Sequence, residues 1–277
     1  MTDHPEVIPT DKSSTATLLT SPSLMESFCA KAHHGAIRIG HALFLIRDYL
    51  FPALFIVLLC TTWPRFLFGS ERADRWMDLL GLMVATLGQG CRALAIGSAA
   101  NIRRGGREKR VAARNLISSG FFAHSRNPLY LGNILIFSGL TLIANSYGWY
   151  FIALPVTVSV YWALMLAEED FLAQKFGEPY VLYRQAVNRF VPKLGGLRAS
   201  LRACHFDWWR ILHKEYGVAC SWLSMVLGLL IWERWEHFGY AARYSEIQAL
   251  ALVFPFLGLG YVVLQLLKRR NSILTRA

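Results

Sequence analysis

Two polar clusters flank a long stretch of the chain that has no charged side chain. The first is Ser125-Arg126-Asn127-Pro128-Leu129-Tyr130, and the second is Glu168-Glu169-Asp170. Residues 127–167 between them contain no Asp, Glu, Lys or Arg. At about 1.5 Å per helical residue, this stretch is long enough for two membrane helices, and Asn145-Ser146-Tyr147-Gly148 predicts a turn in its middle. A helical hairpin returns to the side from which it started, so we expect both clusters to lie together at one membrane surface.

The acidic pair has the chemistry of a site that holds a cation. Glu168 and Glu169 are expected at the carboxyl end of a membrane helix, where the helix dipole disfavours negative charge. Acids in such a place need a cationic partner, and Arg126 and Arg92 are the candidates, since an arginine inside a membrane segment usually faces a partner or a polar cavity. A solvated helix end for the acids and a snorkelling Arg92 are the simpler alternatives. We predict Glu168, Glu169 and Arg126 as catalytic residues.

Two neighbouring segments have a pattern that helix geometry alone does not explain. Asn127 and Pro128 suit the start of a helix, but this role does not account for Arg126, Tyr130 and Gly132 beside them. The apolar segment from Leu116 to Phe122 interrupts a basic stretch and is a candidate re-entrant lining for a cavity. The sequence has no glycine-rich nucleotide motif, no HExxH and no Ser-His-Asp order. The histidines near the first helix lack metal-site spacing, so no metal is expected.

The composition is that of a polytopic membrane protein. Of the 277 residues, 54% are hydrophobic and 17% are charged, with a mean hydropathy of +0.33. A soluble domain is usually about a quarter charged, and the long uncharged runs argue against a soluble protein with a large core. The net charge of +11 is expected to face anionic lipid rather than nucleic acid.

The hydropathy pattern predicts an all-α protein with about six transmembrane helices and an interfacial amphipathic helix after the fourth. The predicted spans are Ala42–Trp63, Trp76–Ala100, Leu129–Ala144, Trp149–Ala167, a short Tyr216–Trp232, and Ile247–Leu267. Apolar and aromatic side chains in residues 171–187 form the amphipathic segment, which Gly177 and Pro179 break into two pieces.

The basic residues predict the orientation of the chain. They concentrate in residues 103–126, 175–214 and 268–276, which fall on one side of a six-helix protein. By the positive-inside rule both termini and the two polar clusters are expected to be cytoplasmic, in an inner or plasma membrane. We divide the chain into a disordered tail (1–40), a two-helix membrane segment (41–100), a core (101–192) and a two-helix extension (193–277).

Five short motifs then give a resemblance to a known family. In chain order they are Leu116 to Phe122, Arg126-Asn127-Pro128-Leu129-Tyr130-Leu131-Gly132, Glu168-Glu169-Asp170-Phe171-Leu172, Phe176-Gly177 with Tyr180 and Tyr183, and Arg189-Phe190-Val191-Pro192. Their order and spacing resemble those of the isoprenylcysteine carboxyl methyltransferase family and its phospholipid N-methyltransferase relatives. The resemblance covers about residues 85–192 and leaves the last two helices outside.

This resemblance implies S-adenosylmethionine as the methyl donor, in a membrane-buried pocket. It also implies a lipid-like acceptor, such as a prenylated small molecule or peptide, that enters from the surrounding membrane lipids. By matched position Leu116, Ile117, Phe122, Asn127, Pro128 and Tyr130 would line the cofactor, and Glu168 would hold its ammonium or a nearby polar group. Gly120 of the same loop is also predicted to bind the cofactor, and Arg114 and Arg107, which precede the loop, are weaker candidates. Methyl transfer requires alignment and desolvation of the reactants rather than a nucleophilic side chain, which agrees with the missing triad.

Two departures from the family pattern leave the acceptor open. Asn127 stands where many members have histidine, and Leu164 stands where members acting on a carboxylate have arginine. Carboxyl O-methylation and phospholipid or other amine N-methylation are therefore both retained. The alternatives outside this class are an NADPH-dependent enzyme like the sterol reductases and a non-catalytic membrane scaffold or transporter. The sequence does not indicate the oligomeric state.

Overall fold

The computed structural model describes residues 24–65, 69–99 and 116–274, and every regular element in this part of the chain is helical. The predicted all-α class is thus confirmed. The elements are α1 (Leu24–Thr61), α2 (Glu71–Ser98), the 3-10 helix η2 (Gly120–Ala123), α3 (Pro128–Ala144), the π-helix η3 (Trp149–Ala153), α4 (Leu154–Phe176), α5 (Glu178–Ala186), α6 (Leu197–Ala203), α7 (Trp208–Phe238) and α8 (Tyr244–Leu274).

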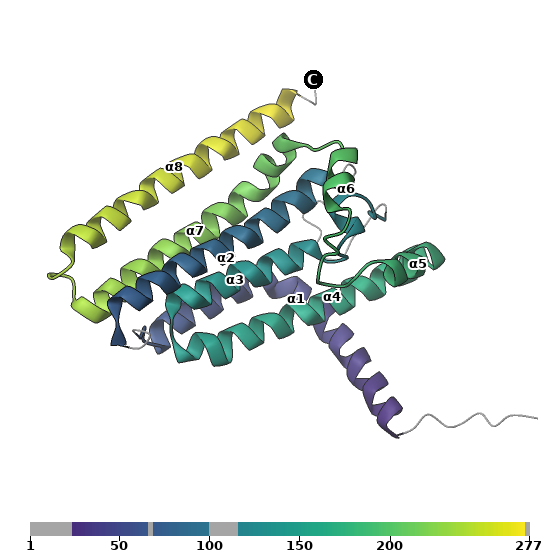
Figure 1. The fold of residues 1–277 in the computed structure, drawn as a ribbon, viewed down its shortest axis with the longest axis horizontal. Coiled ribbons are helices and arrows are strands. Elements are labelled where there is room, and N and C mark those ends of the chain that lie inside the picture. The colour runs from purple at the N-terminus through teal and green to yellow at the C-terminus, as the bar shows by residue number, and fades with distance from the viewer. Residues whose placement is uncertain (1–23, 66–68, 100–115, 275–277) are drawn as a thin grey trace, which may run out of the picture.

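The long helices form a bundle, and α5 and α6 lie near one of its ends (Figure 1). Helices α2 and α3 have the most extensive contact in the described part of the chain, and glycines lie along it. A Cβ atom added to Gly88 would lie 2.6 Å from the carbonyl oxygen of Gly132, and one added to Gly81 would lie 2.6 Å from that of Gly139. Small residues of this kind let the backbones of membrane helices approach one another.

The hairpin predicted across the uncharged stretch is present. Helix α3 ends at Ala144 and is followed by the cap residue Asn145, whose φ of 38° is left-handed; η3 begins at Trp149 and continues directly into α4. The left-handed conformation suits asparagine at a helix end better than most other residues. The start of α3 and the second half of α4 consequently lie on the same side of the bundle.

The number of membrane spans differs from the prediction of six. By length and composition, four helices in the described part of the chain are able to cross a membrane, at Glu71–Ser98, Trp149–Phe176, Trp208–Phe238 and Tyr244–Lys268. Helix α1 gives a fifth only if its two pieces, Gly35–Arg47 and Tyr49–Thr61, count as one span, because they meet at an angle of 78°. Helix α3 is apolar but has 17 residues, about 25 Å of helix, which is less than the bilayer core.

Several predicted helix boundaries are also corrected. Helix α1 begins at Leu24, so residues 24–40 are helical rather than part of a disordered tail. Helix α4 continues to Phe176, so the acidic pair lies within the helix and not at its end. Helix α7 is 31 residues long and not short. The break expected at Gly177 is present, with a φ of 61°, and α5 follows it.

Two apolar clusters hold the bundle together. The larger one joins α2, α3, η3 and α7 around the fully buried side chains of Leu140, Trp149 and Leu229. The smaller one joins α1, α3 and α4 and includes Tyr130 and Leu164. The polar clusters predicted from the sequence lie beside this smaller cluster.

Candidate functional site

Glu169 on α4 is the centre of a buried ion cluster. Its Oε1 accepts hydrogen bonds from Nδ2 of Asn127 at 3.0 Å and Nε of Arg189 at 3.1 Å. Its Oε2 accepts from Nη2 of Arg189 at 3.0 Å and Nη1 of Arg126 at 3.4 Å. The predicted meeting of the Arg126-Asn127 segment with the acidic pair is therefore confirmed. Each carboxylate oxygen of Glu169 already has two protein donors, so this carboxylate has little capacity left for a ligand.

Hydrogen bonds also join the segment before α3 to the backbone of the segment after α5. The amide of Arg126 donates to the carbonyl of Asn188 at 2.9 Å, and the hydroxyl of Ser125 donates to the carbonyl of Phe190 at 3.0 Å. These bonds hold the segment after α5 against the start of α3. Arg189 belongs to one of the five sequence motifs but is not among the predicted site residues. It lies 20 residues after Glu169 in the sequence, and this spacing does not indicate that the two side chains meet.

Glu168 faces a different environment from its neighbour Glu169, because successive residues of a helix point about 100° apart. Its carboxylate lies near the hydroxyl of Tyr130 on α3 and within electrostatic range of the Arg47 guanidinium on α1. The side chain is partly buried, whereas Glu169 is 5% exposed. Glu168 thus combines burial with fewer protein donors and is the better placed of the two acids to bind a cationic group.

Tyr130, the neighbour of the Glu168 carboxylate, belongs to an aromatic and apolar cluster. The rings of Tyr130 and Tyr161 are 5.8 Å apart, and Phe51 of α1 stacks on Tyr161 at 4.9 Å. Leu164, which stands where an arginine would be expected for a carboxylate acceptor, is fully buried in the same apolar cluster. These side chains would exclude water from the surroundings of Glu168. Electrostatic interactions are stronger where water is excluded.

The predicted cofactor loop is anchored to the end of α2 and to α5. Gly120 has a φ of 64°, and a Cβ atom there would lie 2.6 Å from Oγ of Ser98. The amide of Phe121 donates to that Oγ at 3.0 Å, and the hydroxyl of Tyr183 donates to the carbonyl of Phe122 at 2.7 Å. Burial raises the pKa of Tyr183 above its usual range.

The individual loop residues differ in burial. Leu116, Ile117 and Phe122 are half-buried, and Phe121 is the buried aromatic residue of the loop. Asn127 and Pro128 are buried at the start of α3, and the side chain of Asn127 is already bonded to Glu169. Arg107 and Arg114 lie outside the described residues.

The proposed pairing of Arg92 with the acidic pair is wrong. Arg92 on α2 binds Glu215 on α7, with Nε to Oε2 at 2.8 Å and Nη2 to Oε1 at 2.9 Å. Its Nη1 donates to Oδ1 of Asn133 on α3 at 2.6 Å. Glu215 directly precedes the predicted span Tyr216–Trp232, so the sequence does not place it within a membrane helix as a partner for Arg92. In the structure it lies within α7. The network ties α7 to α2 and α3.

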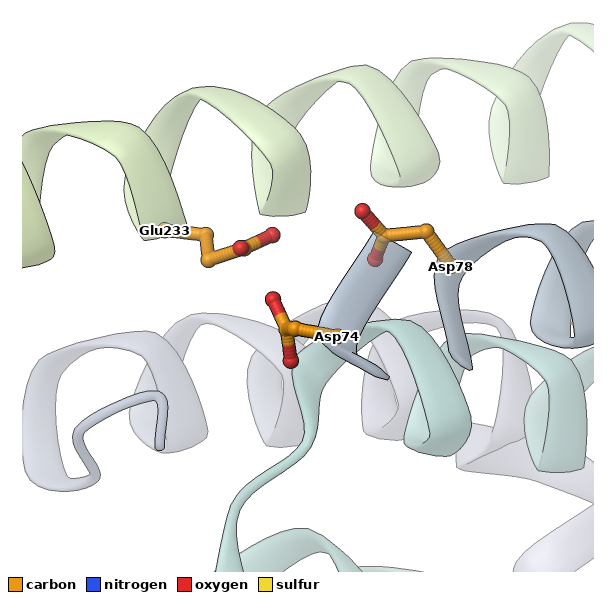
Figure 2. Close-up of side chains that lie close together, drawn as sticks. All are labelled: Asp74, Asp78 and Glu233. Atoms are coloured by element: carbon orange, nitrogen blue, oxygen red, sulfur yellow. The ribbon is translucent and has the colours of Figure 1, made fainter. Parts of the chain in front are cut away.

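A second acidic group lies at the opposite end of α3 from Asn127, about 25 Å away along the helix. Figure 2 shows Asp74 and Asp78 of α2 with Glu233 of α7. One carboxylate oxygen from each of the three residues lies within 4.8 Å of the other two. Carboxylates are the ligands that divalent cations prefer, but Arg234 already supplies a cation here, with its Nη1 3.0 Å from Oε2 of Glu233. Asn145 donates to Asp74 at 2.8 Å, so the group also ties α2, α3 and α7 together.

One of the comparisons with known proteins found a match. Residues 77–179 match the sequence model of a family described as phospholipid methyltransferase. No curated protein and no solved structure matches the chain. The matched segment contains Arg126, Asn127, Tyr130 and both glutamates, whereas α1, α7 and α8 lie outside it. Over residues 77–179, which are less than half of the chain, the protein is therefore similar to the phospholipid methyltransferase family.

Proposed function

We propose that the protein transfers a methyl group from S-adenosylmethionine to a lipid-like acceptor at the Glu168 site. The observation that carries the proposal is the difference between the two acids inside the segment that matches the methyltransferase family. Glu169 is saturated by Arg126, Asn127 and Arg189, whereas Glu168 keeps capacity for a cationic ligand.

The residues present fit this cofactor. The carboxylate of Glu168 suits an ammonium group, and the rings of Tyr130 and Tyr161 suit a sulfonium, since cations are attracted to aromatic faces. When bound, S-adenosylmethionine would supply a methyl group on a sulfonium: an acceptor lone pair would bond to the methyl carbon in line as the carbon–sulfur bond breaks, and its electron pair would leave on sulfur as a neutral thioether. Leu116, Ile117, Gly120 and Phe122 would contact the remainder of the cofactor.

The chain's own residues would act by binding, orientation and exclusion of water. In this proposal the cluster of Glu169 with Arg126 and Arg189 holds α4 against the start of α3 and thereby fixes the position of Glu168. Arg126 and Glu169, predicted as catalytic, become positioning residues, and Glu168 remains the residue that touches the cofactor. The site would open to the cytoplasmic side, as the basic segments predict.

The acceptor is proposed as a lipid or a prenylated molecule that reaches the site from the bilayer. Carboxyl O-methylation, as in the isoprenylcysteine enzymes, is one form of the reaction. Phospholipid or amine N-methylation is the other, and we favour it because Leu164 is apolar at the position where a carboxylate acceptor would call for arginine.

Calorimetry of the purified protein in detergent tests the donor. S-adenosylhomocysteine should bind the wild type, and Glu168→Gln should weaken binding by about 10- to 100-fold, the value of one charged hydrogen bond. Glu178→Gln is the matched control, because Glu178 is an exposed acid of the same segment. Absence of binding to the wild type would refute the proposal.

A second measurement identifies the acceptor. Incubation of the protein and methyl-labelled donor with host membranes should place the label in the lipid extract. Label that survives mild base would indicate an N-methyl group, whereas base-labile label would indicate a methyl ester. Label confined to non-lipid small molecules would contradict the lipid-like acceptor.

A further inference from the structure

Helix α8 lies at the edge of the bundle, beside α7 (Figure 1). Its apolar side chains, such as Leu252, Phe256 and Leu259, are exposed and would face lipid in a membrane. A groove of about 480 Å³ lies between α8, α7 and the second piece of α1. This volume is within the range of sites that bind small molecules. The residues that line the groove include neither Glu168 nor Tyr130, so it is separate from the proposed methyl-donor site.

Small and apolar side chains line much of this groove. Gly217 of α7 and Gly258 of α8 both contribute, and a Cβ atom added to either would meet no other atom within 4 Å. The hydroxyl of Ser221 donates to the carbonyl of Gly217 at 2.8 Å, so it is satisfied within its own helix. Phe55 of α1 and Leu257 of α8 add apolar surface. A lining of this kind suits a hydrocarbon chain.

One end of the groove leads to a positively charged side chain. The rings of Tyr261, in the groove, and Tyr216 are 5.3 Å apart. The Nζ of Lys268 lies 5.5 Å from the centre of the Tyr216 ring and donates to the carbonyl of His213 at 3.3 Å. Both of these partners are neutral, so the ammonium keeps its charge for an anion. Lys268 lies about 10 Å along α8 from Tyr261.

This end of α7 and α8 has the residues of a membrane surface. Trp208 and Trp209 at the start of α7 are exposed, and tryptophan is enriched at the level of the lipid headgroups. Lys268 is exposed, and Arg269 and Arg270 follow it in the sequence. Basic residues at this level attract anionic lipids. A charged end and an apolar groove thus follow one another along α7 and α8, in the order of the headgroup and acyl chain of a lipid.

We propose that this groove binds an anionic phospholipid, with its phosphate at Lys268 and an acyl chain along α7 and α8. The bound chain fills the space between α1, α7 and α8 and thereby holds α8 to the rest of the bundle. The site lies outside the segment that matches the methyltransferase family, and the proposal does not depend on the proposed function.

A second copy of the chain fits this face less well than a lipid does. Two copies in one membrane have the same orientation, so a symmetric contact through α8 would bring their two Lys268 ends together. Like charges repel each other, and the surrounding Arg269 and Arg270 of each copy would add to the repulsion. An anionic headgroup instead neutralises this end of the helix.

Native mass spectrometry of the delipidated full chain in neutral detergent tests the charged end of the site. The probes are dioleoyl-phosphatidylglycerol and dioleoyl-phosphatidylcholine, which share their acyl chains and differ in net charge. The wild type should retain a single phosphatidylglycerol saturably and bind phosphatidylcholine more weakly. Lys268→Gln should lower the affinity for phosphatidylglycerol by about 5-fold, the effect of one basic residue near an anionic lipid, and leave that for phosphatidylcholine unchanged. Lys175→Gln is the matched control, because Lys175 is an exposed lysine at the end of α4.

Two glycines of α8 provide a matched test of the apolar part. A Cβ atom at Gly258 or at Gly260 would meet no other atom within 4 Å, but Gly258 lines the groove and Gly260 does not. Gly258→Phe should fill the groove and abolish the retention of both lipids, whereas Gly260→Phe should bind them as the wild type does. If Gly258→Phe does not fold, Lys268→Gln decides the test.

Three results would overturn the proposal. The first is a wild type that retains no lipid, or a series of lipids without saturation, as expected of bulk lipid around the bundle. The second is equal affinity for the two phospholipids in the wild type. The third is a dimer of the wild type that Gly258→Phe dissociates, because a second copy of the chain would then occupy the groove.

Discussion

The guanidinium of Arg92 and the carboxylate of Glu215 form a two-point ion pair in the interior of the bundle. Their side chains are 11% and 5% exposed. The amide of Gln89 adds a third donor to Glu215 at 3.0 Å, and Trp222 donates to the other end of Gln89 at 2.9 Å. The pair connects α7, which lies outside the matched family segment, to α2 within it.

Removal of one partner of this pair should be strongly destabilising. Glu215→Ala leaves the Arg92 charge buried without an anion, at a cost of about 3–5 kcal/mol. The unfolding midpoint in detergent should fall accordingly. The double variant Arg92→Met/Glu215→Leu should recover most of the loss, because it removes both charges. Glu236→Ala, an exposed acid on the same helix, is the control. A Glu215→Ala protein that unfolds with the wild type would contradict the prediction.

The Glu169 cluster should matter for folding more than for ligand affinity. Glu169→Gln leaves Arg126 and Arg189 without their anion and should cost about 3–5 kcal/mol of stability. Since the protein's own donors occupy both oxygens of Glu169, this residue acts only by positioning Glu168, and the folded fraction should lose less affinity for S-adenosylhomocysteine than Glu168→Gln does. Thermal unfolding and calorimetry of the same preparation check both parts. A loss of affinity as large as that of Glu168→Gln would show that Glu169 contacts the ligand.

Two glycines on α2 provide a matched test of helix packing. Gly88→Ala places a Cβ atom 2.6 Å from the backbone oxygen of Gly132 and 2.8 Å from the amide nitrogen of Ile136, so α2 and α3 must separate. We expect a loss of about 1–3 kcal/mol in the free energy of unfolding. Gly90→Ala meets nothing within 4 Å and should be neutral or stabilising by up to about 1 kcal/mol. Equal midpoints for the two variants would rule out tight α2–α3 contact.

Tyr183 should contribute to the pH dependence of stability. Burial raises its pKa in the folded protein, so the folded state holds this proton more tightly than the unfolded chain, whose tyrosines titrate near about 10. The contribution is present below about pH 10 and is lost as the pH rises above that value. Unfolding midpoints of the wild type and Tyr183→Phe should therefore converge as the pH rises. A difference that stays constant into strong alkali would contradict the raised pKa.

The sequence by itself determined the class of the protein, the hairpin and the identity of the polar clusters. Residues 127–167 lack charge, and lipid permits such a stretch only as helix or barrel, since no water is present to satisfy the backbone. The turn at Asn145 follows from the Asn145-Ser146-Tyr147-Gly148 segment in the middle of this stretch. The meeting of Asn127 with the acidic pair follows from the resulting hairpin. The break at Gly177 was also predictable, because glycine adopts positive φ without strain.

Only the tertiary structure decided which charge pairs with which. Arg92 selects Glu215 rather than the acidic pair, and Arg189 completes the Glu169 cluster. Each of these pairings depends on how a helix is rotated about its axis and on which helix lies next to it. Hydropathy constrains neither quantity, because lipid and a neighbouring apolar helix are nearly equivalent surroundings for an apolar side chain. The contacts at glycines and aromatic rings fix them, and those contacts exist only once the helices have packed.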